Sequence, residues 1–93
     1  MTACNSPIIM KSTKSFKKIL AVLGGRLAEL REKKGYETLK EFTEKYDLPK
    51  IQYWRIEKGK ANITLKTLVN VLSIHNISLH DFFCLLAEDE QII

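Results

Sequence analysis

The segment from Thr38 to Gly59, TLKEFTEKYDLPKIQYWRIEKG, constrains the fold of this chain more than any other stretch. Thr38 and Glu41 form a capping box, which predicts a short helix from there to about Tyr46. Pro49 fits only the first turn of a helix, so a second helix is expected to begin near it and to end at Gly59. The segment therefore predicts two short helices joined by a tight turn.

The rest of the chain also has helical periodicity. Apolar steps of three and four residues predict a first helix from about Ser15 to Lys34, in which Gly24-Gly25 indicates a kink or the close approach of another helix. Thr64 and Ser78 are expected to cap a fourth and a fifth helix. The residues expected to be buried in these last two helices are Leu65, Leu68, Val69, Val71, Leu72, Leu79, Phe82, Phe83 and Leu86.

A length of 93 residues fits one small domain. The predicted fold is therefore an all-α, five-helix domain over residues 15–86. A flexible basic tail is expected at residues 1–14, and a short C-terminal tail at residues 87–93. The N-terminal tail has two interpretations: a frayed terminus, or a basic arm (Lys11, Lys14, Lys17 and Lys18) that adds phosphate contacts.

The positive charge of the chain is concentrated in its first two thirds. Residues 1–66 carry all fifteen Lys and Arg against seven acids, a net charge of +8, whereas residues 67–93 carry four acids and a net charge of −4. A basic N-terminal part and an acidic C-terminal part would orient the domain toward a polyanion. The hydrophobic fraction of 45% means that the chain can fold, so it is not a disordered polyelectrolyte.

The second helix of the opening segment has two different sides. At 100° per residue, one arc carries Lys50, Ile51, Trp54, Arg55 and Lys58, while Gln52, Tyr53 and Ile56 fall mostly on the other side. In a helix-turn-helix, the second helix enters the major groove of DNA. Arg55 suits guanine, Ile51 a thymine methyl, and Lys58, Lys60 and Asn62 suit phosphates. The alternative is a solvated basic face with Trp54 at its rim.

The order of these signals resembles the phage repressor/Cro-like helix-turn-helix family, also called the xenobiotic-response-element type. The matching segments are LGGRLAELREKKG, the helix pair that ends in RIEKGK, TLKTLVNVL and ISLHDFF, which together span residues 23–83. The resemblance implies a five-helix domain, usually homodimeric, that binds double-stranded DNA as a transcriptional regulator. It implies base-facing roles for Lys50, Ile51 and Arg55, with Trp54 at the groove wall.

The same resemblance implies backbone contacts for Lys60 and Asn62, and a pair between Arg31 and Glu57 that locks the third helix onto the body. Thr38 would contact phosphate at the start of the second helix. The chain departs from the family pattern where Leu39 replaces a phosphate-binding Gln and where Pro49 replaces a Ser or Thr cap. Thr43 also replaces a small Ala between the two helices.

The sequence gives less support to other classes of protein than to a DNA-binding regulator. His75 and His80 are too far in sequence from each other and from Cys4 and Cys84 to predict a metal site. No catalytic residues, cofactor or metal are predicted, so the chain is not expected to be an enzyme. A module that presents Ile51 and Trp54 to another protein remains an alternative. So does the antitoxin of a toxin–antitoxin pair, whose toxin-binding segment would be residues 1–15 or 84–93.

Two further expectations concern assembly and location. The apolar residues Cys84, Leu85, Leu86, Ile92 and Ile93 exceed what the end of a five-helix domain can bury, which predicts a homodimer. No apolar run approaches the ~20 residues of a membrane span, and the first residues are too weakly apolar for a signal peptide. Two cysteines make no disulfide framework, so reduced thiols in a cytoplasmic protein are expected.

Overall fold

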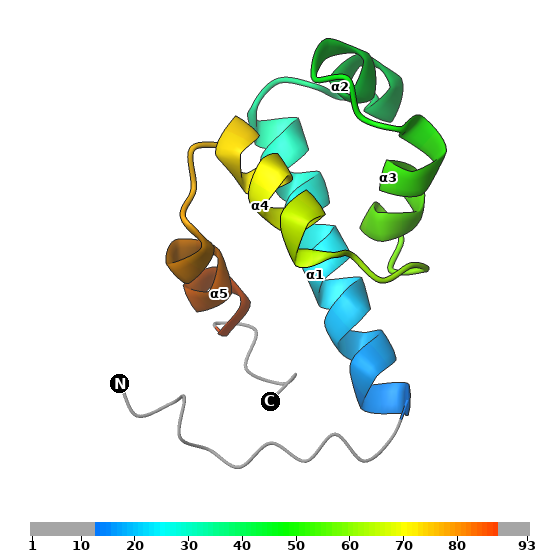
Figure 1. Ribbon diagram of the computed structural model, residues 1–93, viewed down its shortest axis with the longest axis vertical. Helices are drawn as coiled ribbons and strands as arrows, with labels where there is room; N and C mark the ends of the chain where they lie inside the picture. Colours follow the sequence, from blue (N-terminus) through cyan, green and yellow to red (C-terminus); the bar gives the residue numbers. More distant parts are fainter. Residues whose placement is uncertain (1–12, 88–93) are drawn as a thin grey trace.

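The computed structural model describes residues 13–87, which form five α-helices and no strand (Figure 1). The helices are α1 (Thr13–Lys33), α2 (Leu39–Lys45), α3 (Lys50–Glu57), α4 (Leu65–Ile74) and α5 (Leu79–Ala87). The predicted all-α, five-helix fold is confirmed. The helix begins at Thr13, so residues 13 and 14 belong to α1 instead of the predicted tail, while residues 1–12 and 88–93 lie outside the described part.

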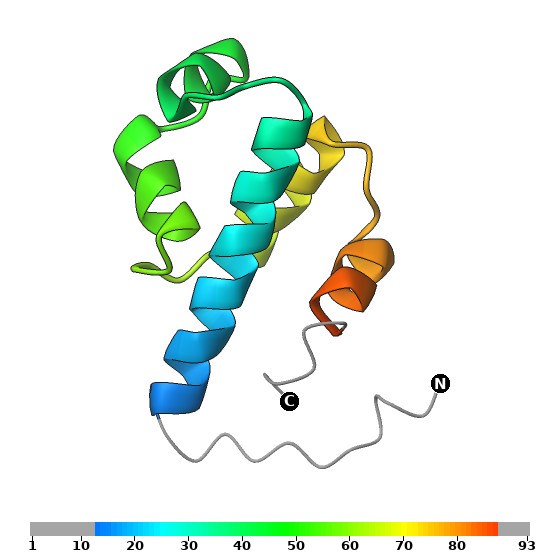
Figure 2. The ribbon, with the colours of Figure 1, turned by 180° about the vertical axis from the view of Figure 1, so that it is seen from behind.

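Helix α1 is the longest element, and the others are arranged around it. Figures 1 and 2 show α2 and α3 on one side of α1 and α5 on the other, with α4 in front of α1 in Figure 1. The buried residues of α4 share one core with Leu23 and Leu27 of α1. No helix within residues 13–87 is by itself long and apolar enough to cross a bilayer. Taken together, α4 and α5 have the length and composition of a span, but they meet at a bend of 96°.

Side-chain caps fix where three of the helices begin. The hydroxyls of Thr38, Thr64 and Ser78 accept hydrogen bonds from the backbone N–H groups of Glu41 (3.2 Å), Thr67 (3.1 Å) and Asp81 (3.0 Å). Each bond satisfies one of the amides that a first helical turn leaves without a partner. The three predicted caps are therefore confirmed.

The turn between α2 and α3 combines two backbone devices. Asp47 has a φ of 55°, a left-handed conformation that Asp tolerates better than most residues. Pro49 is the N-cap of α3 and makes no side-chain cap bond, so it lies one residue before the first turn in which it was predicted, and the helix begins at Lys50. The amide of Leu48 donates to the carbonyl of Thr43 (2.9 Å), which closes the end of α2.

Two glycines allow α3 and the loop after it to lie against α1. A Cβ at Gly24 would clash with the carbonyl oxygens of Ile56 and Glu57, whereas a Cβ at Gly25 would meet nothing within 4 Å. At Gly59 the φ is +71°, and a Cβ would lie 2.9 Å from the Cα of Ala21. The predicted close approach is confirmed at Gly24, and α1 is a continuous helix through both glycines.

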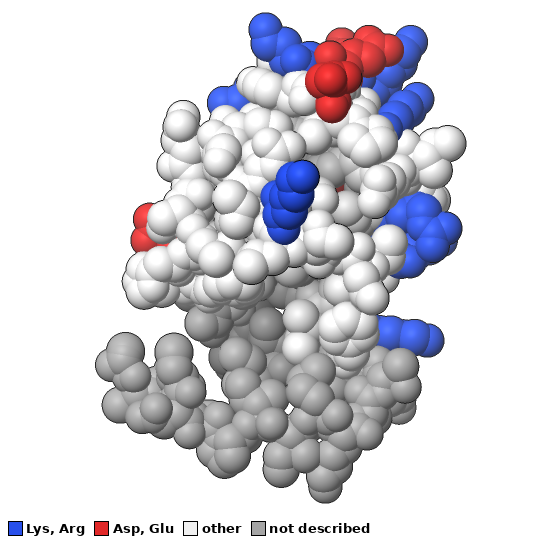
Figure 3. Space-filling view, viewed as in Figure 1, with Lys and Arg blue, Asp and Glu red and all other residues white. Residues whose placement is uncertain are grey.

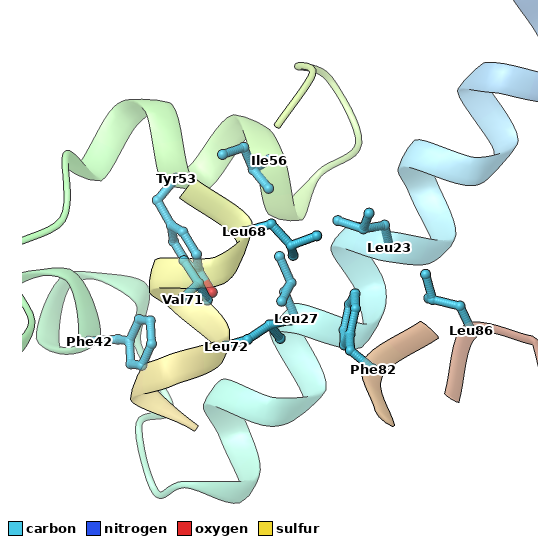
Figure 4. Close-up of a cluster of buried hydrophobic side chains, with 10 residues drawn as sticks. All are labelled: Leu23, Leu27, Phe42, Tyr53, Ile56, Leu68, Val71, Leu72, Phe82 and Leu86. Atoms are coloured by element: carbon cyan, nitrogen blue, oxygen red, sulfur yellow. The ribbon is translucent and has the colours of Figure 1, made fainter. Parts of the chain in front are cut away.

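One core joins all five helices (Figure 4). Its center is formed where α1, α4 and α5 meet, and Phe42 of α2 with Tyr53 of α3 extends it toward the helix pair. The buried apolar residues are Leu23, Leu27, Phe42, Tyr53, Ile56, Leu68, Val71, Leu72, Phe82 and Leu86.

Three residues that the sequence predicted to be buried are exposed. Leu65 is 64% exposed, and Val69 and Phe83 are both 45% exposed, whereas Val71 is fully buried. The buried face of α4 is centred on Leu68, Val71 and Leu72, and Val69 lies to the side of this face, where it is partly exposed to solvent. Leu65 and Phe83 instead border an open hollow at the surface.

Candidate nucleic-acid interface

Helix α3 is anchored on one side and exposed on the other. Tyr53 and Ile56 are 2% and 3% exposed, and these two side chains hold α3 to the core. The four residues predicted to read bases, Lys50, Ile51, Trp54 and Arg55, are all exposed, with Ile51 at 75% and Trp54 at 41%. Gln52, which the sequence placed mostly on the inner side, is exposed as well.

This exposed surface mixes cations with large apolar groups. Lys50 and Trp54 are one helical turn apart, and so are Ile51 and Arg55, so the four side chains leave α3 on neighbouring rows. We call these four residues the α3 face. Apolar side chains gain nothing from exposure to water, and their presence between cations is typical of a surface that contacts a partner.

The loop after α3 is held against the end of the α3 face. The amide of Lys60 donates to the carbonyl of Arg55 (2.8 Å), and Nη2 of Arg55 donates to the carbonyl of Lys60 (3.3 Å). The ammonium of Lys60 lies 5.4 Å from the center of the Trp54 ring, a cation–π contact. Of the predicted phosphate contacts, Lys58, Lys60 and Asn62 are all exposed here.

Thr38, the fourth predicted phosphate contact, lies at the other end of the helix pair. Its side chain is exposed, but its hydroxyl oxygen already accepts the Glu41 amide as the cap of α2. Thr43, in the same helix, is buried and donates to the carbonyls of Leu39 (3.0 Å) and Lys40 (3.2 Å). A hydroxyl at the contact between the helices is therefore satisfied within α2 and does not disturb the core.

Arg31 and Glu57 join α1 to the end of α3. Nε of Arg31 donates to Oε2 of Glu57 (2.9 Å) and Nη2 donates to Oε1 (3.2 Å), a two-pronged pair between side chains that are almost fully buried. Nη1 of Arg31 donates to the carbonyls of Tyr36 (2.7 Å) and Glu37 (2.9 Å). The structure thus brings together the two members of the expected pair, and the same guanidinium also fixes the loop before α2.

Two pKa values reflect this buried contact. The hydrogen bond that Arg31 donates to the Glu57 carboxylate raises the pKa of Arg31 above its ordinary value, so the guanidinium stays charged. Burial raises the pKa of the Tyr53 hydroxyl, and the neighbouring carboxylate of Glu57 raises it further. The Tyr53 hydroxyl therefore stays neutral throughout the physiological pH range.

The charge of the molecule is distributed unevenly over its surface. Figure 3 shows a mostly uncharged surface over α4, with basic side chains gathered along the margin where α3 lies. Because charged ligands are attracted by the summed field of a surface, a polyanion would approach this margin and not the face over α4.

No protein-family model, curated protein or solved structure matches this chain. The resemblance to the repressor family therefore depends on the sequence motifs, and the roles that it implies stay predictions. The geometry of the α3 face does not depend on that resemblance.

One contact on α5 was missed in the sequence. His80 and Cys84 are one helical turn apart, and Nε2 of His80 lies 3.6 Å from Sγ of Cys84, so the expectation that His80 is far from either cysteine was wrong. The i, i+4 spacing was the available signal. Within residues 13–87, no group of three or more His, Cys, Asp or Glu side chains is placed to bind a metal ion.

The residues expected to form a dimer interface also need correction. Leu86 is buried in the core, and Leu85 is half-buried, so neither offers a free apolar surface. Cys84 is exposed, while Ile92 and Ile93 lie outside the described residues. The exposed apolar side chains of this side of the molecule are Phe16, Leu65, Val69 and Phe83.

Proposed function

We propose that this protein binds double-stranded DNA sequence-specifically and acts as a small transcriptional regulator, a repressor in the cytoplasm. The observation that carries the proposal is the α3 face. Its four exposed side chains project from a helix whose other side is fixed by Tyr53, Ile56 and the Arg31–Glu57 pair. A helix held in this way presents its outer side chains in a fixed geometry, as reading of base edges requires.

Each member of the α3 face has a chemical role in this proposal. Arg55 can donate to O6 and N7 of a guanine, and Lys50 can reach the same groove edge. Ile51 supplies an apolar contact for a thymine methyl, and Trp54 covers sugar at the groove wall. Lys58, Lys60 and Asn62, beside the end of α3, would position the domain by contacting phosphates, as would Thr38 at the start of α2.

The protein is proposed to form a homodimer, and its interface is a different apolar surface from the one that the sequence predicted at the end of the chain. Phe16, Leu65 and Phe83 border an open hollow of about 270 Å³, and Val69 is exposed on α4. Several large apolar side chains exposed together favour burial against a partner. This hollow shares Phe16, Leu20 and Asn62 with a second hollow beside the α3 face, but no residue of the α3 face lines it. A second copy bound there would lie next to the α3 face and leave its side chains free for DNA.

A protein-binding module is the second candidate, because Ile51 and Trp54 are the kind of exposed apolar anchors that protein interfaces use. The salt dependence of binding separates the two functions. A dimer that contacts phosphates should lose affinity with a log–log slope on the order of −5, whereas an apolar protein contact should change little. An antitoxin would bind a toxin as well as DNA, and the toxin would contact one of the terminal segments, residues 1–15 or 84–93.

Selection of bound sites from a random duplex pool tests the proposal. A regulator should enrich a short palindrome, whose half-site spacing also gives the geometry of the dimer. On the selected site, Arg55→Ala should cost about 1–3 kcal/mol of binding free energy and relax the preference at one base. Lys60→Ala should weaken selected and random duplexes alike. A pool that shows no enrichment would contradict sequence-specific binding, and an equal loss for Arg55→Ala on both duplexes would make Arg55 a phosphate contact.

A further inference from the structure

A basic hollow lies beside the α3 face, where three parts of the chain meet. It has a volume of about 770 Å³ and is open to solvent. The N-terminal part of α1 provides Phe16, Lys17 and Leu20, α3 provides Arg55, and the loop after α3 provides the remainder of the lining, Gly59, Lys60, Ala61 and Asn62. Among these described residues there are three cations and no Asp or Glu.

The loop and the end of α3 are fixed in the fold. The backbone of Gly59 packs on Ala21 of α1 so closely that no side chain fits between them. Lys60 is tied to Arg55 by two hydrogen bonds that run in opposite directions between the residues. Lys17 is one helical turn before Ala21, so the same contact places Lys17 next to the loop.

Three cations around one hollow repel one another unless an anion lies between them. No carboxylate lines the hollow to offset this repulsion, in contrast to Lys33 at the other end of α1, which shares its surroundings with Glu29 and Glu32. The hollow is therefore suited to a phosphate.

We propose that this hollow binds a phosphate of the DNA backbone next to the groove that α3 reads, and that Lys17 of α1 is one of its contacts. The inference rests on the proposed DNA binding. It commits to the duplex instead of a free phosphate because Arg55 belongs to both the hollow and the α3 face, and Lys60 lies against Trp54. A backbone strand that follows the groove past the end of α3 would cross the hollow.

Titrations of the full chain with a selected duplex at several salt concentrations test this role. Lys17→Ala should bind several-fold more weakly and reduce the salt slope by about 0.9 per protomer, or about 1.8 for a dimer, because each protomer loses one phosphate contact. Lys17→Arg should restore both values. Lys33→Ala, in the same helix but beside Glu29 and Glu32, is the matched control and should leave both unchanged.

A second experiment locates the phosphate. Neutral methylphosphonates replace the phosphates of the selected duplex one at a time, and affinity is measured for the natural chain and for Lys17→Ala. At one flanking position the natural chain should lose several-fold in affinity, and Lys17→Ala should lose clearly less, because only the contacts from Arg55, Lys60 and Asn62 remain to be removed. If both proteins show the same profile and the same salt slope, the inference is wrong although DNA binding stands. If the natural chain binds no duplex at all, both the proposed function and the inference are wrong.

Discussion

The two sides of α1 are stabilised by different interactions. On one side, α3 packs against α1 by backbone contact at Gly24 and by the buried Arg31–Glu57 pair, and it leaves a basic surface outside. On the other side, α4 and α5 pack by apolar side chains and leave Leu65, Val69 and Phe83 exposed. The difference shows that α3, besides the apolar contacts of Tyr53 and Ile56, has a directed charged contact and a close backbone approach that fix its orientation on α1.

The largest effect is expected when the charged contact is broken. Arg31→Met leaves the carboxylate of Glu57 buried without its cation and should lower the free energy of unfolding by about 3–5 kcal/mol. Adding Glu57→Leu should restore much of this loss, since no charge is then left unpaired. Glu29→Gln, which removes the exposed pair with Arg26, is the control and should cost less than about 1 kcal/mol. Denaturant unfolding measures all four proteins. If Arg31→Met lowered the free energy of unfolding as little as the control does, the Arg31–Glu57 pair would not be what holds α3.

The backbone contact at Gly24 can be tested with its neighbour as the control. Gly24→Ala puts a methyl group against the carbonyls of Ile56 and Glu57 and should destabilise the protein by about 1–3 kcal/mol. Gly25→Ala meets open space and should stabilise it by up to about 1 kcal/mol, as expected for Ala over Gly within a helix. Thermal unfolding of the two variants checks the prediction. Equal effects would show that α3 does not approach α1 at Gly24.

An intermediate effect is expected from pH at the end of α4. His75 stacks on Phe42 of α2 (ring centers 5.5 Å apart), and burial, with a smaller contribution from Lys34, lowers the pKa of its imidazole. The unfolded chain therefore binds the proton more readily than the folded one. The free energy of unfolding should therefore be unaffected by His75 above about pH 6.5. It should fall as the pH drops from there through the lower pKa of the folded state, by at most about 1.4 kcal/mol per pH unit.

Denaturant unfolding between pH 8 and pH 4 measures this loss. His75→Gln should flatten the profile below pH 6.5, whereas His80→Gln, which changes an exposed side chain, should leave it as in the natural chain. A profile that is unchanged in His75→Gln would assign the pH dependence to other groups.

The smallest effect on stability is expected on the α4–α5 side. Leu65→Gln and Phe83→Gln change exposed side chains and should alter the free energy of unfolding of the monomer by no more than about 0.5 kcal/mol. If these side chains form the dimer interface, the same variants should shift sedimentation toward the monomer, because the apolar contact is weakened at its center. A natural chain that sediments only as a monomer at high concentration, with and without DNA, would rule out the dimer.

Sequence reasoning succeeded where local rules decide the structure. The capping hydroxyls of Thr38, Thr64 and Ser78 and the stop at Gly59 fix helix boundaries through bonds within a few residues, so they could be predicted directly. The wheel of α3 placed Tyr53 and Ile56 in the core correctly, because adjacent turns of one helix share a face.

It failed where the outcome depends on which element covers which. Leu65, Val69 and Phe83 have the composition of core residues, and only the arrangement of α1, α4 and α5 leaves them exposed. The proximity of Lys17 to Lys60 likewise follows from the packing of Gly59 on α1 and has no signal in the spacing of the two lysines. Pairwise patterns along a chain do not contain this information.

The most direct measurement is an NMR titration of the isotope-labelled full chain with the selected duplex in dilute buffer. The proposed function predicts shifts in the amides of α3, Lys60 and Asn62, and the further inference adds a shift at Lys17 in α1. The amides around Val69 and Phe83 should not shift. Spectra that do not change on addition of duplex, or shifts confined to the α4–α5 side, would contradict the assignment of the α3 face to DNA.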